Sequence, residues 1–180
     1  VVVIFLGRLN CDKGVQVLID AMAGVWERFP TVKLLLVGPD ENGVVSGSGF
    51  VQGLIADGKL MHRGFSDRPH EFLNCADIFC MPSFREGFGV SALEASATGL
   101  PIICSDIYGL SDVVEGCGLT FSVGDSVQLG ERIMQLVDSP ELRALLGQSG
   151  ARKARALYPR QRLISELERF YSGLLNETNY

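Results

Sequence analysis

A chain of 180 residues with 47% hydrophobic side chains can bury a sizeable core, and its length fits one domain better than two. The formal net charge of -5 argues against a generally basic surface for nucleic acid, so an anionic ligand would need locally placed Arg and Lys side chains. Five cysteines, an odd number without CxxC spacing, indicate free, buried thiols in a reducing compartment rather than a disulfide or metal framework. No apolar run approaches the roughly 18 residues of a membrane span.

Strand and helix patterns alternate from the first residue onward. The run VVVIFLG at 1–7 is continuously apolar and rich in β-branched residues, as in a strand buried on both faces of a parallel sheet. Apolar residues then recur at helical spacing from Val15 to Phe29, and Pro30 ends this helix. Further strands, with helices or loops between them, are expected at 32–38, 60–64, 77–83, 101–106 and 118–123.

These patterns predict an α/β fold with a doubly wound, Rossmann-like parallel sheet of about six strands, followed by a helical tail from about residue 125. We expect residues 1–180 to form one domain. Because the chain starts inside a predicted strand and without Met, it is expected to be a piece of a longer protein. Ligands of such sheets bind at the carboxyl ends of the strands, so the loops that follow strands are the candidate sites.

The loop after the first strand, GRLNCDKG, carries Arg8 and Lys13 around a turn that leads into a helix. Two cations beside free backbone N–H groups and the positive end of a helix suit a phosphate or diphosphate. The loop alone fits equally well a solvated Arg8 and an ordinary surface Lys13. The sequence has neither GxGxxG after a strand nor GxxxxGK[ST], which argues against a dinucleotide site and a P-loop NTPase.

Two other features carry little functional information. The Gly-rich loop at 38–49 follows a strand, but long loops are commonly rich in glycine for flexibility. His62 and His70 are far in the sequence from any second metal ligand at a suitable spacing, so no zinc site is predicted. His62 is expected to be a satisfied core or edge residue of a strand, and His70 a surface residue of a short helix.

The stretch SFREGFG places Glu86 in the loop after the strand at 77–83. Gly87 and Gly89, on either side of Phe88, allow the backbone to approach a ligand closely and to present N–H groups to it. A carboxylate accepts hydrogen bonds from hydroxyl groups, and free amides hold an anionic oxygen. Such a loop suits a sugar joined to a phosphate.

Glu94 follows eight residues later, near the start of the next helix. Its carboxylate could bind adjacent ribose hydroxyls, as acidic residues do in other nucleotide-binding α/β folds. Ser91-x-x-Glu94 also reads as a capping box, in which Glu94 only bonds back to the Ser91 N–H. The same helix is expected to bury Val90, Leu93 and Ala97.

The segment PSFREGFGVSALEASATGLPIICSDIYGLSDVV, with its Glu-x7-Glu pair, closely resembles the signature of the retaining GT-B glycosyltransferases of family 4, the glycosyl transferases group 1 domain. GRLNCDKGVQVLIDAM resembles the first loop and helix of that family, and FSDRPHEFLNCADIFCMPS resembles the segment before the signature. The resemblance runs over nearly the whole chain. SDIYGLSD departs from the pattern by lacking the commoner glycine pair, and DVVEGCGLTF is more compact than in many relatives.

The resemblance implies a role for each matching residue. Arg8 and Lys13 would bind the donor diphosphate, and Glu86 would hold the donor sugar and favour the positive charge that develops on its ring. The amides of Phe88 and Gly89 in the Gly87–Gly89 segment would assist, and Glu94 would bind the ribose. Backbone near Arg63 to Phe65 would border the base.

The resemblance also implies half of a GT-B enzyme, without the N-terminal domain that supplies the acceptor groups. The expected activity is retaining hexosyl transfer from a nucleotide-diphosphate sugar, with UDP-sugar as the expected donor and no metal or other cofactor required. The isolated chain is expected to be inactive. The expected acceptor is a glycan or a lipid-linked molecule, as in bacterial surface polysaccharide synthesis.

The full-length protein is expected in the cytoplasm, with possible association at the inner membrane face, and nucleic acid is not an expected partner. A non-catalytic nucleotide-sugar-binding module and a GT-B-like sugar-nucleotide epimerase are the alternatives.

Overall fold

The chain forms a six-stranded sheet in the order β3-β2-β1-β4-β5-β6, with every adjacent pair parallel. This computed structural model describes residues 1–177. The six predicted strands are confirmed, each one or more residues shorter than its sequence pattern, at Val2–Leu6 (β1), Lys33–Val37 (β2), Leu60–Arg63 (β3), Ile78–Met81 (β4), Ile102–Ser105 (β5) and Gly118–Phe121 (β6). Strand order reverses between β1 and β4, which is where a doubly wound sheet opens its ligand cleft.

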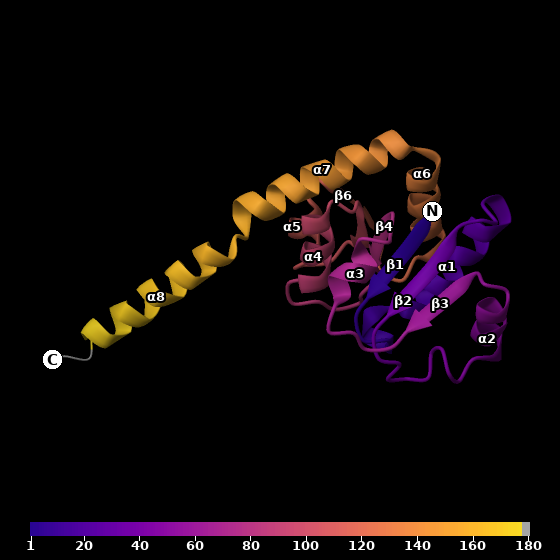
Figure 1. Cartoon of the computed structure of the whole chain (residues 1–180), viewed down its shortest axis with the longest axis horizontal. Helices are drawn as coiled ribbons and strands as arrows, with labels where there is room; N and C mark the ends of the chain where they lie inside the picture. Colours follow the sequence, from indigo (N-terminus) through magenta and orange to yellow (C-terminus); the bar gives the residue numbers. More distant parts are fainter. Residues whose placement is uncertain (178–180) are drawn as a thin grey trace.

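Helices cover both faces of this sheet (Figure 1). A 3-10 turn, η1, spans Cys11–Lys13. The α-helices are Val15–Arg28 (α1), Gly49–Ala56 (α2), Pro69–Leu73 (α3), Val90–Thr98 (α4), Ser111–Val114 (α5), Ser126–Asp138 (α6), Pro140–Leu157 (α7) and Arg160–Glu177 (α8). Side chains of α1, α2 and α6 pack on one face of the sheet, and side chains of α3, α4 and α5 pack on the other.

The alternation of side chains along each strand creates two hydrophobic cores. In β1, Val3 and Phe5 join the core under α1 and α6, whereas Ile4 joins the core under α4. All three are completely buried. A run of apolar residues in a strand is therefore explained by burial on both faces.

The face that α4 buries differs from the predicted one. Val90 is 62% exposed and Ala97 is also exposed, while the helix buries Ala92, Ala95 and Ser96. Small residues lie inward because α7 runs close to α4. A Cβ atom on Gly150 of α7 would come within 2.6 Å of the Ser96 hydroxyl, so a larger residue at either position would force the helices apart.

The thiols are free, as predicted, but only three of the five are buried. Cys80, Cys104 and Cys117 are buried, whereas Cys11, the first residue of η1, and Cys75, just after α3, are exposed. The expectation that the thiols are buried is therefore wrong for these two.

The two C-terminal helices, α7 and α8, lie differently relative to the α/β unit. In Figure 1, α7 runs along the edge of the α/β unit and α8 extends away from it. Leu167, Phe170 and Tyr171 of α8 are exposed in this structure. Over the described part of the chain, no helix combines the length and the apolar character that a membrane span requires.

Candidate donor-binding site

A hollow of about 540 Å³ lies at the carboxyl ends of β1 and β2, beside the start of α4. Arg8, Lys13, Glu86 and Glu94 all line it. They come from three different loops or helices, so the structure brings together the four charged residues singled out in the sequence. The complete lining is Leu6, Gly7, Arg8, Lys13, Val37, Gly38, Pro39, Phe65, Ser66, Pro69, Glu86, Val90, Ser91 and Glu94.

A larger hollow of about 810 Å³ surrounds the edge strand β3. Its lining contains none of those four residues. Volume alone therefore does not identify the site. The smaller hollow has opposite charges facing each other at the switch point of the sheet, which is where ligands of doubly wound folds bind.

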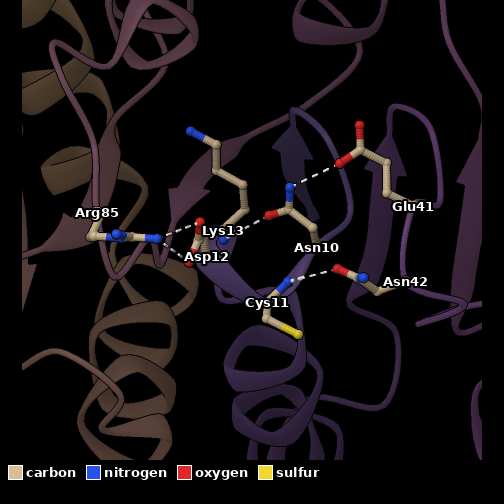
Figure 2. Close-up of polar contacts among 7 residues, drawn as sticks. All are labelled: Asn10, Cys11, Asp12, Lys13, Glu41, Asn42 and Arg85. Atoms are coloured by element: carbon tan, nitrogen blue, oxygen red, sulfur yellow. Dashed lines mark hydrogen bonds and ion pairs between the residues drawn. The ribbon is translucent and has the colours of Figure 1, made fainter.

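The loop after β1 is fixed by its own hydrogen bonds (Figure 2). Asn10 caps η1, because its Oδ1 accepts a hydrogen bond from the Lys13 N–H at 3.2 Å. Gly14 then adopts a left-handed conformation, with φ of 64°, before α1 begins. These constraints determine where Lys13 leaves the backbone.

Lys13 and Glu86 form an ion pair across the hollow, between Nζ and Oε2. Only 20% of the Lys13 side chain and 16% of the Glu86 side chain are exposed. A partly buried pair is screened less by salt than a surface pair, so each group strongly orients the other.

A second ion pair ties the loops after β1 and β4 together (Figure 2). The Arg85 guanidinium donates to both carboxylate oxygens of Asp12, at 2.9 and 3.1 Å. The Phe84 N–H also donates to the Asp12 carbonyl at 2.8 Å. These contacts hold the segment before Glu86 against the turn that carries Lys13.

The segment from Gly87 to Gly89 leads directly into α4. Gly89 is the N-cap of α4, with φ of 70°, and no side chain caps the helix. The first N–H groups of α4 therefore receive no side-chain hydrogen bond at the N-cap, which is the arrangement that binds anions at helix N-termini. Gly87, Phe88 and Gly89 do not themselves line the hollow.

The capping-box interpretation of Glu94 is wrong. Helix α4 starts at Val90, so Ser91 is already inside the helix and cannot be its N-cap. Ser91 and Glu94 instead both line the hollow. This location leaves the Glu94 carboxylate exposed toward solvent and accessible to a ligand.

Several residues of the site were not found in the sequence. Glu41 and Asn42, in the loop after β2, contact the loop after β1 (Figure 2). Phe65, 83% exposed, also lines the hollow, whereas the resemblance implied a role only for the backbone near it. Tyr158, at the end of α7, contacts the Phe88 ring edge to face, with centroids 5.5 Å apart. These residues lie in loops without periodicity or far from their partners in sequence, so no local pattern marks them.

The two histidines lie where the sequence predicted. His62 is half-buried on the edge strand β3, with Nε2 2.9 Å from the Gly38 carbonyl oxygen. His70 is exposed on α3. Within residues 1–177, no three His, Cys, Asp or Glu side chains converge as ligands of one metal ion would.

Residues 1–153 match the family described as Glycosyl transferases group 1. Capsular polysaccharide biosynthesis glycosyltransferase CapM of Staphylococcus aureus is 30% identical over 177 residues, 97% of this chain and 46% of CapM. D-inositol 3-phosphate glycosyltransferase of Corynebacterium efficiens is 35% identical over 163 residues, 86% of this chain and 38% of that protein. The chain thus spans less than half the length of these relatives.

The chain also spans less than half the length of two solved structures that share its fold. Sucrose-phosphate synthase from Thermosynechococcus elongatus is 28% identical with a TM-score of 0.83, and the match covers 98% of this chain and 46% of that one. HepE from Anabaena, solved in complex with UDP, is 22% identical with a TM-score of 0.85, covering 96% and 48%. At 22% identity the likeness to HepE concerns the fold alone.

Proposed function

Because the chain belongs to the glycosyl transferases group 1 family of GT-B enzymes, we propose that it is the donor-binding half of a retaining glycosyltransferase that uses a UDP-sugar. The observation that carries the proposal is the convergence of Arg8, Lys13, Glu86 and Glu94 on one hollow at the switch point of the sheet. Two cations and two carboxylates in one cleft match the charges and hydroxyl groups of a nucleotide sugar.

Each part of the donor has a matching group in the proposed complex. Lys13, Arg8 and the N-terminal N–H groups of α4 bind the diphosphate, and they stabilise the charge that it gains as it leaves the sugar. These groups supply positive charge without a metal ion, so transfer is proposed to need none. Glu94 accepts hydrogen bonds from the ribose hydroxyls.

Glu86 has the role closest to the reacting bond. Its carboxylate is mostly buried and lies against Lys13. Once the diphosphate engages Lys13, Glu86 is available to bind donor hydroxyl groups and to stabilise positive charge on the sugar ring. We assign it an electrostatic role in a transfer of hexose with retention.

The biological setting is proposed from the relatives. CapM acts, by its name, in capsular polysaccharide biosynthesis, and a bacterial surface polysaccharide is accordingly the proposed product. The acceptor, a glycan or a lipid-linked molecule, would bind an N-terminal domain of a longer protein. We propose that the enzyme works in the cytoplasm, at the inner membrane face where such acceptors are presented.

Calorimetric titration of the chain with UDP tests donor binding. Binding at the micromolar to millimolar level is expected, and a folded sample that binds no nucleoside diphosphate would contradict the proposal. The reaction itself requires the full-length protein, because the chain spans less than half of its relatives. NMR of the glycosylated product then tests retention by comparing the anomeric configuration of donor and product.

A further inference from the structure

The guanidinium group proposed to bind the donor diphosphate already has a carboxylate beside it. Arg8 Nη1 lies 3.5 Å from Glu41 Oε1. The Arg8 side chain is 63% exposed and the Glu41 side chain 38%, so both charges are solvated and the pair is weak. An incoming diphosphate could therefore displace Glu41 from Arg8, but it would then lie near an unpaired negative charge.

Glu41 also supports the turn that carries Lys13 (Figure 2). Its Oε2 accepts a hydrogen bond from Asn10 Nδ2 at 2.9 Å. Asn10 in turn accepts from the Lys13 N–H through Oδ1. The carboxylate of Glu41 thus combines two functions: one depends on its charge, and the other needs only a hydrogen-bond acceptor.

The backbone of Glu41 is held close to the site. Its N–H donates to the Leu9 carbonyl at 3.1 Å. The neighbouring Asn42 accepts a hydrogen bond from the Cys11 N–H at 3.2 Å. These two bonds hold the Glu41 backbone against the loop that carries Arg8, so the Glu41 charge stays near Arg8.

Asp40 fixes the other side of the same loop. Its carboxylate accepts hydrogen bonds from the N–H groups of Val44, Val45 and Ser46 and from the Ser46 hydroxyl, at 2.8 to 3.2 Å. Burial raises the pKa of Asp40, but these hydrogen bonds outweigh burial and lower the pKa below its ordinary value. Asp40 is therefore ionised at neutral pH and accepts these hydrogen bonds within the loop that presents Glu41.

We propose that Glu41 sets the donor affinity of the cleft, because its negative charge competes with the diphosphate for Arg8 and repels it. The inference rests on the proposed function, since it takes Arg8 as a diphosphate contact. Removing the charge while keeping the acceptor should tighten UDP binding about three- to tenfold, as expected for unit charges several ångströms apart in a solvated site.

Three variants separate charge from hydrogen bonding. Glu41→Gln keeps an oxygen that can accept from Asn10 and removes only the charge. Glu41→Ala removes both. Glu131→Gln makes the same charge change on an exposed residue of α6 that does not line the hollow. UDP is titrated into each by calorimetry at about 0.05 M and 0.5 M salt, after thermal unfolding has shown that each variant is folded.

The expected result is tighter binding by Glu41→Gln, a smaller gain or a loss in Glu41→Ala, and no change in Glu131→Gln. The advantage of Glu41→Gln should shrink at the higher salt concentration, where charges are screened over shorter distances. Equal or weaker UDP binding by folded Glu41→Gln, with normal binding by the unsubstituted chain, would overturn the inference alone. If the unsubstituted chain binds no UDP, the proposed function fails and the inference fails with it.

Discussion

Replacing Gly14 with alanine tests how closely the two loops that carry Lys13 and Glu86 approach each other. Gly14 has φ of 64°, and a Cβ atom built on it would lie 1.9 Å from the Pro82 carbonyl oxygen. Gly58 has the same φ of 64°, but nothing lies within 4 Å of its Cβ position. The two substitutions therefore share the backbone strain and differ only in the steric clash.

The expected magnitudes follow from these geometries. Alanine in the left-handed region costs about 1–2 kcal/mol, which is the whole effect expected for Gly58→Ala. At Gly14 the backbone must also move by about 1 Å to bring the contact to an acceptable distance. Overpacking of this kind adds about 1–3 kcal/mol, so Gly14→Ala should lower the free energy of unfolding by about 2–5 kcal/mol.

Urea unfolding of the two variants and the unsubstituted chain measures the difference, provided that the slopes of the transitions agree. Gly14→Ala should also weaken UDP binding, because movement of the loop shifts Lys13 from its place in the hollow, whereas Gly58→Ala should not. Destabilisation of the two variants to within about 0.5 kcal/mol of each other would refute the close approach of the loops, since additive effects agree to about that level.

Three further predictions concern the site and the core. Lys13→Ala should weaken UDP binding by at least about tenfold in calorimetry, because a lost charge-assisted hydrogen bond costs about 1.5–3 kcal/mol. Lys33→Ala removes an exposed lysine outside the hollow and should bind UDP normally. Tyr158→Ala in the full-length enzyme should raise KM for the donor a few-fold, because the contact of its ring with Phe88, in the loop that carries Glu86, is worth about 0.5–1.5 kcal/mol. Tyr158→Phe keeps the ring and should have a nearly normal KM. Equal KM values in both variants would contradict this role. When the native chain is alkylated at pH 8, mass spectrometry should find Cys11 and Cys75 modified first. Burial raises the pKa of the other three thiols and keeps them protonated. Equally fast labelling of a third thiol would disprove the burial pattern.

The fold could be predicted from the sequence because its signals are local. Runs such as VVVIFLG are too uniformly apolar for a half-exposed strand, and the periodic helix from Val15 to Arg28 lies between two of them. The rule that ligands bind after the carboxyl ends of parallel strands then selects the right loops. Arg8, Lys13 and Glu86 all follow strands, and the structure places them around one hollow.

The contacts between loops could not be predicted, because no sequence period relates them. The loop at 38–49 reads as a flexible connection, yet Asp40 orders it and Glu41 contacts the loop after β1. The Phe88–Tyr158 contact joins residues 70 positions apart. The capping box failed for a different reason: Gly89, in a left-handed conformation, starts α4 before Ser91.

A crystal structure of the chain with UDP tests the central claim most directly. The account predicts the diphosphate within hydrogen-bonding distance of Lys13 Nζ, with Glu86 released from that lysine and the ribose hydroxyls on the Glu94 carboxylate. UDP bound elsewhere, for example in the larger hollow around β3, with the Lys13–Glu86 ion pair intact, would contradict it.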